Sequence, residues 1–210
     1  MTVQTDVKIA SVQVNENVRS IADVAPQQTV LADREIVLVI NSFDYDVARL
    51  LNATMAGMNP TDSYIEVIGT DVNDEPLTER IDVSNPGGGR VTFISENYFK
   101  TFTSATVSPN YPLTSALSMG MEGTARTILP NVTKTRIKGY QTTAEEPFLG
   151  ATSNMSFYDG DFLPTSLILR TYASPGSEDF PIAGEGLYLK DTLHIEYDTG
   201  NTRVINIFYA

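Results

Sequence analysis

Short stretches in which apolar and polar residues alternate constrain this chain more than any other feature of its sequence. Residues 63–70 alternate over a full strand length, residues 71–76 are polar turn formers, and residues 77–83 alternate again. A period of two residues puts successive side chains on opposite faces of a strand, whereas a helix needs a period of about 3.6. The three segments together therefore predict an antiparallel hairpin.

The same pattern recurs along the chain. Further strands are predicted at residues 28–41, 91–95, 101–107, 125–129, 132–140, 151–158, 165–172, 185–189, 192–198 and 202–209. The last two, joined by turn residues 198–201, form the clearest predicted hairpin, and the apolar run 36–40 indicates a strand buried on both faces. Residues 96–100 and 48–58 show some helical character, although 48–58 fits a strand and loop equally well.

Many short strands separated by turns are typical of β-sandwiches and small barrels. We therefore expect an all-β fold, with two antiparallel β-sandwich or barrel-like domains and an extended N-terminal arm. Residues 1–27 form the arm or strand, residues 28–130 the first β domain and residues 131–210 the second, because prolines punctuate residues 108–132. The arm either pairs with a neighbouring subunit or forms an edge strand of its own domain, and the sequence leaves both open.

Composition narrows the function classes. The chain has 210 residues, 26 acidic against 14 basic side chains, and a formal net charge of −12. Proteins that grip nucleic-acid phosphates need clustered Lys and Arg, so no specific nucleic-acid binding is expected. The acidic excess fits either simple solubility or a surface that repels DNA. The chain has no cysteine, no signal-peptide pattern and no apolar run of about 18 residues, so disulfides, thiolate metal sites and membrane partners are not expected.

Residue types that carry catalysis or metal binding occur without their supporting motifs. His194 is the single histidine, and its place within a predicted strand favours a structural role over a Ser/His/Asp triad assembled from distant residues. Residues 71–75 and 159–161 could each offer carboxylates to a cation, but the first segment lacks the Gly and Glu of a calcium-binding loop. The loop at residues 85–90 lacks the Gly-Lys-Ser/Thr ending of a phosphate-binding loop. We expect no cofactor and no enzymatic activity.

Aromatic residues in the second half of the chain could form a sugar-binding platform, but their loose spacing favours packing in a core. These residues are Phe148, Phe157, Tyr158, Phe162 and Tyr172. Asp159, Asp161 or Glu145 could supply carboxylates at the roughly 5 to 10 Å separation that glycosidases use. No motif selects any pair of them.

A recurring order of short motifs runs through residues 34–107. After a strand at 34–39, a strand that ends in Gly-Thr-Asp at residues 65–71 is followed by a Thr-Glu strand at 77–81 and a glycine turn at 87–89. A Tyr-Phe-Lys-Thr stretch at 98–101 then precedes a closing strand at 103–107. This order resembles a module of tailed-bacteriophage structural proteins. The resemblance implies a β-meander with Phe99 and Phe102 in its core, and it carries over no catalytic residue.

The C-terminal part is similar to phage domains that end in Gly-Glu-Gly, a strand, a turn and a final strand. Here these segments are residues 184–189 and 204–209. The stretch at residues 44–58 departs from the tight hairpin of the resembled module. The resemblance as a whole implies a repeated virion subunit, assembled in the host cytoplasm, without fixing its position in the particle.

Three function hypotheses follow. The first is a ring-forming subunit of a phage neck or short tail (a connector, tube or nozzle), whose acidic lumen lets DNA slide. The second is a capsid decoration or cement protein that stabilises the head. The third, from another class, is a glycan-binding or glycan-active module. Under the first two, the partners are other copies of this chain and the portal, tail or major capsid protein.

Loops between the predicted strands are the expected places of contact with other virion proteins. The predicted inter-subunit contact residues are Asp71, Asn73, Asp74, Pro86, Gly88, Arg90, Glu145 and Glu146.

Overall fold

The structure, a computed structural model, describes residues 7–13, 20–30, 36–41, 44–57, 62–108, 115–144, 153–173, 177–198 and 202–210. These residues confirm the expected all-β class. The strands are β1 (Lys8–Gln13), β2 (Ser20–Val30), β3 (Ile36–Val37), β4 (Asp44–Ala56), β5 (Tyr64–Thr70), β6 (Pro76–Asp82), β7 (Arg90–Val107), β8 (Ser115–Thr133), β9 (Arg136–Ala144), β10 (Ser153–Asp159), β11 (Leu167–Ala173), β12 (Ser177–Pro181), β13 (Leu187–Tyr188), β14 (Thr192–Asp198) and β15 (Thr202–Tyr209). One short 3-10 helix, Pro164–Ser166, precedes β11. Within the described part of the chain, no helix has the length and apolar character that crossing a membrane requires.

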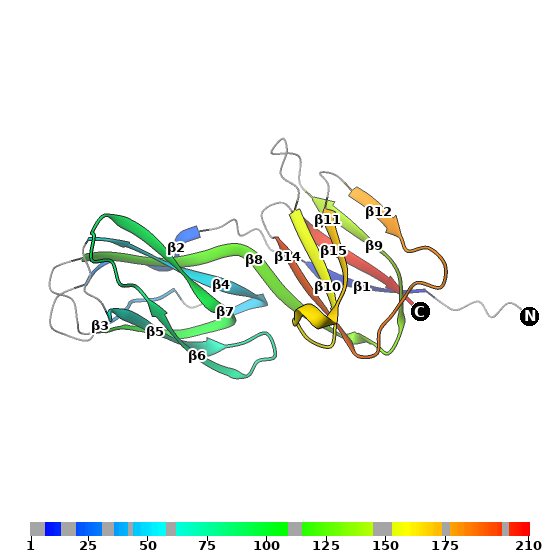
Figure 1. Ribbon diagram of the computed structural model, residues 1–210, viewed down its shortest axis with the longest axis horizontal. Helices are drawn as coiled ribbons and strands as arrows, with labels where there is room; N and C mark the ends of the chain where they lie inside the picture. Colours follow the sequence, from blue (N-terminus) through cyan, green and yellow to red (C-terminus); the bar gives the residue numbers. More distant parts are fainter. Residues whose placement is uncertain are drawn as a thin grey trace, which may run out of the picture. The chain divides into compact units, whose positions relative to one another are not determined.

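The chain divides into two compact units. The central unit is residues 18–125, and the terminal unit combines residues 1–17 with residues 126–210. Both ends of the chain belong to the terminal unit because β1 pairs antiparallel with β15, as the blue and red strands of Figure 1 show. Residues 1–27 were expected to form an arm to a neighbouring subunit or an edge strand of their own domain, and Lys8–Gln13 forms an edge strand on its own chain.

The central unit contains the strand order β8-β4-β7-β5-β6, with β2 paired to β8 and β3 to β7 (Figure 1). The inward side chains of these strands form one core cluster. Its largest members include Leu51, Met55, Ile65, Phe99, Phe102, Leu117, Met119 and Met121. The implied core positions of Phe99 and Phe102 are confirmed by this cluster, in which each is at most 4% exposed.

The predicted hairpin at residues 63–83 is confirmed. Strands β5 and β6 pair in unbroken register from Tyr64 opposite Asp82 to Thr70 opposite Pro76. Gly69 of β5 lies close to the backbone of Thr101 on the neighbouring strand β7, and a Cβ added at Gly69 would collide with the carbonyl oxygen of Thr101. Glycine at this position therefore permits the tight packing of the hairpin onto β7.

Two sheets face each other in the terminal unit. Sheet A has the order β1-β15-β9-β12, with β13 also paired to β9, and sheet B contributes β11, β10, β14 and β8. The ring of Tyr140 in sheet A lies 5.3 Å from that of Phe157 in sheet B. Its hydroxyl is also 2.6 Å from the Oγ1 of Thr171 on β11. The terminal unit is therefore a β-sandwich, as expected.

The predicted hairpin at residues 192–209 is wrong, although both of its strands exist. Strand β14 pairs with β10 in sheet B, whereas β15 pairs with β1 and β9 in sheet A. Alternation specifies which face of a strand is buried but not which strand lies beside it. Here Ile195 of β14 and Ile207 of β15 are both fully buried, and their strands belong to the two opposed sheets.

Two further expectations are corrected. Residues 96–100, which showed some helical character, lie within β7, where Tyr98 pairs with Leu50, so cross-strand pairing overrides a weak helical preference. For residues 48–56 the strand alternative is confirmed, because they lie in β4. Only Ile36–Val37 is a strand in the apolar run, and Val39 is 69% exposed, so the run is not buried on both faces. The division between the two units, at Ala125 and Arg126, falls within the predicted break at residues 108–132, but the chain passes through it as the continuous strand β8.

Candidate interaction site

Four residues form one row across the outer face of sheet A. Ile9 lies opposite Phe208, Phe208 opposite Gly139, and Gly139 opposite Pro181. Ile9 is 61% exposed, whereas Val12, whose side chain points to the other face of the same strand, is 6% exposed. Single exposed apolar side chains are common on protein surfaces, whereas apolar residues that lie next to one another on a surface can mark an interaction site. We call these four residues the apolar row.

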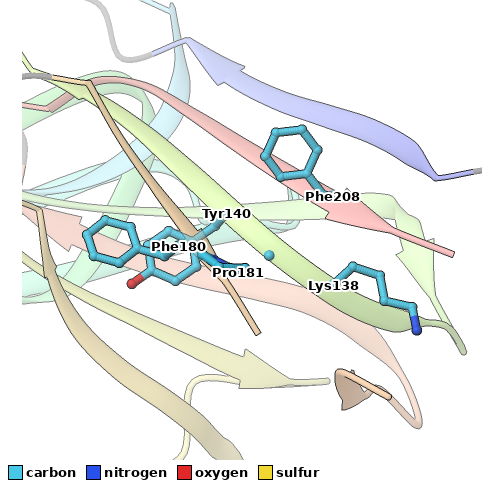
Figure 2. Close-up of a pocket in the computed structure, with 6 residues that line it drawn as sticks. Lys138, Tyr140, Phe180, Pro181 and Phe208 are labelled. Atoms are coloured by element: carbon cyan, nitrogen blue, oxygen red, sulfur yellow. The ribbon is translucent and has the colours of Figure 1, made fainter. Parts of the chain in front are cut away.

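A pocket of about 320 Å³ lies at the end of the apolar row nearer β12 (Figure 2). Its lining comes from three strands and consists of Lys138, Gly139, Tyr140, Phe180, Pro181 and Phe208. The rings of Tyr140 and Phe180 stack at 4.7 Å between centroids and 16° between planes. A Cβ added at Gly139 would lie 2.9 Å from the carbonyl oxygen of Phe180, so glycine here permits the close approach of β12 to β9. We call this cavity the Gly139 pocket.

The charged group at the Gly139 pocket is turned away from its interior. In Figure 2 the side chain of Lys138 extends away from Tyr140 and Phe180. Its Nζ donates a hydrogen bond of 2.8 Å to the carbonyl oxygen of Glu185. The other lining residues are mostly apolar in type, which suits an apolar side chain better than a charged ligand.

A polar ladder lies beside the apolar row and holds β1 in place. The Ser11 hydroxyl donates to Oδ1 of Asn206 at 2.6 Å, and Nδ2 of Asn206 donates to Oε1 of Gln141 at 2.9 Å. These bonds link β1, β15 and β9 across one face of the sheet. Strand β1 is thus a fixed part of the sheet, and its outer edge is presented in a defined position.

His194 is buried on the outer face of sheet B. It is 7% exposed, and its ring lies 4.9 Å from the ring of Phe162. The guanidinium of Arg126 lies 4.5 Å from the centroid of the same Phe162 ring and pairs with Glu196 at 2.7 Å. Burial lowers the pKa of His194 from its ordinary value, against the opposing attraction of nearby carboxylates. Burial of the ring thus disfavours its protonated form.

The acidic turn near His194 uses its carboxylates to hold the backbone. Asp159 accepts hydrogen bonds from the N–H groups of Lys190 and Asp191 at 3.0 and 2.7 Å. Asp161 accepts from the N–H of Leu163 at 3.1 Å. Hydrogen bonds from Ser166 and Leu163 lower the pKa of Asp161. Across the described ranges, no cluster of three or more carboxylate or histidine side chains could hold a metal ion.

The predicted contact residues Asp71, Asn73 and Asp74 lie in the β5–β6 turn. Oδ1 of Asp71 accepts the N–H groups of Asn73 at 2.7 Å and Glu75 at 3.0 Å. Asp74 has a φ of 66° and pairs with Lys100 at 2.7 Å. The carboxylate of Asp71 thus closes the turn itself, as aspartate commonly does in tight turns.

Pro86 and Gly88 lie in the turn that leads into β7, and Arg90 is the first residue of that strand. Pro86 and Arg90 are exposed. Nδ2 of Asn85 donates to the carbonyl oxygens of Gly57 and Gly89 at 3.0 and 3.3 Å, which joins this turn to the end of β4. Glu145 and Glu146 lie outside the described residues. Neither of the two turns contributes to the apolar row.

Core packing, which the sequence favoured over a sugar-binding platform, is confirmed for Phe157 and Tyr158. Phe157 is 1% exposed and Tyr158 is 6% exposed, so both are packed rather than presented to solvent. Phe162 packs on Tyr158 at 5.6 Å between ring centroids. Phe148 lies outside the described residues.

Sequence reasoning missed the apolar row, apart from noting that the segment containing Ile9 alternates. The four residues come from four strands, and only the sheet register brings them into line. No protein-family model matches this chain, and no curated protein sequence matches it.

Proposed function

We propose that this chain is a non-enzymatic structural subunit of a tailed-phage virion, and in particular a ring-forming subunit of the neck or short tail. One observation carries the proposal. Ile9 of the edge strand β1 is 61% exposed and Val7, which comes just before the strand, is 56% exposed, and sheet A also carries an apolar pocket. Such an edge offers backbone pairing and apolar contact together, which are the two contributions that strand addition between proteins uses.

The charge balance supports the neck or tail rather than another part of the virion. With 26 acidic and 14 basic residues, a closed ring of this chain carries a large negative charge. Like charges repel, so DNA phosphates pass such a wall without adhering to it. The low density of cations also argues against a role in packaging DNA by direct contact.

Copy number in the virion tests this proposal. Quantitative mass spectrometry of purified virions, with the major capsid protein as the internal standard, should give roughly 6 to 12 copies per particle, as a closed ring requires. Hundreds of copies would favour the alternative, a capsid decoration protein, which the same exposed edge also supports. Absence of the chain from purified virions would contradict both structural functions.

A further inference from the structure

Sheet A ends in two strands, β1 and β12, and no described strand pairs with the outer edge of either. Each strand of the order β1-β15-β9-β12 runs antiparallel to its neighbour. The first and last strands of the four therefore run in opposite directions. A second copy in the same orientation can place its β1 beside β12 as an antiparallel neighbour, which needs no reversal of either molecule.

The backbone of β12 offers its groups to that neighbour at alternate residues. The N–H of Ile182 donates to the carbonyl oxygen of Lys138 on β9 at 2.9 Å. Successive residues of an antiparallel strand point their N–H and C=O groups to opposite sides. Pro181 and Asp179 therefore turn their backbone groups away from β9, toward the outer edge, although Pro181 has no N–H to donate.

The same alternation, followed across the sheet, fixes the outer edge of β1. Gly139 lies opposite Pro181 and turns its backbone groups the other way, toward Phe208. The backbone groups of Phe208 point toward Gly139 and therefore away from β1. Ile9, which lies opposite Phe208 on β1, therefore makes no backbone hydrogen bond to Phe208, and its own backbone groups point to the outer edge. Ser11, two residues further along β1, points in the same direction.

From this arrangement we propose that β1 of one copy pairs with β12 of the next, with Ile9 opposite Pro181 and Ser11 opposite Asp179. This inference rests on the proposed assembly function and names its contact. In this register the outward-facing backbone groups of β1 in one copy meet the outward-facing backbone groups of β12 in the next. Ser11 and Asp179 then form a pair in which each backbone N–H donates to the carbonyl oxygen of the other residue. Sheet A then continues from subunit to subunit.

The side chains favour this head-to-tail contact over a symmetric one. The register brings exposed Ile9 of the second copy next to Pro181, so the apolar row continues and the added side chain lies beside the Gly139 pocket. Pairing of β1 with β1 across a twofold axis is also antiparallel, but it leaves the pocket uncovered and closes at a dimer. Only head-to-tail pairing uses both edges and can form a ring.

Proline at either edge tests the contact directly. Ser11→Pro and Asp179→Pro each remove an N–H that faces outward, and each should weaken association by roughly 100-fold. Ser11→Ala and Asp179→Ala keep the N–H and are the matched controls. Thr78→Pro is the control at another edge, that of β6. The N–H of Val83 donates to the carbonyl oxygen of Ser63, so it points toward β5. Successive residues alternate in direction, so the N–H of Thr78 points outward. Native mass spectrometry of the purified full chain should show oligomers larger than a dimer for wild type and all three controls.

Mixing the two proline variants separates head-to-tail from symmetric pairing. Ser11→Pro retains a working β12 edge, and Asp179→Pro retains a working β1 edge. Each variant alone should be monomeric, with circular dichroism like that of wild type, and the equimolar mixture should form a one-to-one dimer that grows no further. A dimer of Asp179→Pro alone, or wild type that stays monomeric at every soluble concentration, would overturn the proposal.

The copy-number measurement on virions is independent of this result. If the chain is present at ring stoichiometry but the mixture forms no dimer, the edge contact is wrong and the virion function stands. If the mixture dimerises but the chain is absent from virions, the contact stands and the proposed function falls.

Discussion

Strand β6 ends the sheet of the central unit, and strand β1 ends sheet A of the terminal unit (Figure 1). Strand β6 begins with a proline and carries several charged side chains, among them Arg80, which pairs with Glu66 at 2.9 Å. Strand β1 carries one charged residue, Lys8, and exposes Ile9. Proline and charge are common means of keeping an edge strand from pairing with other chains. The contrast indicates that one edge is protected and the other is available for assembly.

Strand β6 is held in the sheet through β5, which pairs with β7, and Gly69→Ala on β5 should disturb that pairing. The added Cβ collides with the backbone of Thr101, so the β5–β6 hairpin must shift. We expect a loss of about 3 kcal/mol in the free energy of unfolding, measured by urea denaturation. Gly87→Ala, where an added Cβ meets nothing within 4 Å, should be close to neutral. Equal effects of the two substitutions would contradict this account of the hairpin.

Charge placed on β1 should convert it into a protected edge like β6. Ile9→Lys removes an apolar contact that assembly buries, and it should weaken self-association by about 2 kcal/mol, or roughly 30-fold. The folding stability of the monomer should hardly change because Ile9 is 61% exposed. Val39→Lys, at a residue 69% exposed on the central unit, is the matched control and should leave association unchanged. Sedimentation equilibrium measures both, and comparable weakening by the control would refute a specific role for β1.

Glu79 on β6 should contribute to folding but not to assembly. Its carboxylate accepts the N–H groups of Glu96 at 2.7 Å and Asn97 at 3.0 Å, which fastens the edge strand to β7. Glu79→Ala should lower the free energy of unfolding by about 1 kcal/mol, and Glu79→Gln by less, because the amide keeps one acceptor. Urea denaturation of the two variants tests this order. A change in oligomeric state would show that β6 takes part in assembly after all.

The smallest expected effect is a pH dependence that originates in the terminal unit. Burial lowers the pKa of His194 below its ordinary 6.5, so the unfolded chain binds the proton more readily than the folded one. The stability that the neutral ring contributes is therefore present above pH 6.5 and lost as the pH falls below it. Urea midpoints on the two sides of pH 6.5 should differ more for wild type than for His194→Gln. Identical pH profiles would mean that His194 does not control this change.

The two regions also differ in how far sequence could predict them. The β5–β6 hairpin followed from local alternation and the turn beginning at Asp71, because its partner strands are neighbours in the chain. The pairing of residues 192–198 with residues 202–209 failed because equally regular alternation is satisfied by strands in opposite sheets. Local pattern specifies the buried face of a strand, whereas long-range register selects its partner.

The candidate site was beyond sequence reasoning for the same reason. Ile9, Gly139 and Phe208 are unremarkable within their own segments, and they form one apolar row only when β1, β15 and β9 are aligned. The contact residues chosen from loops, such as Asp71 and Arg90, were selected for their turn-forming types. Their contacts with other subunits stay a prediction.

Amide hydrogen exchange in the assembled protein tests the contrast between the two edges most directly. On assembly, the amides of Ile9 and Ser11 should exchange at least about tenfold more slowly, as expected for newly formed strand pairing. The outward amides of Thr78 and Arg80 on β6 should exchange as they do in the dilute monomer. Protection of the β6 amides with unchanged exchange at β1 would contradict the account.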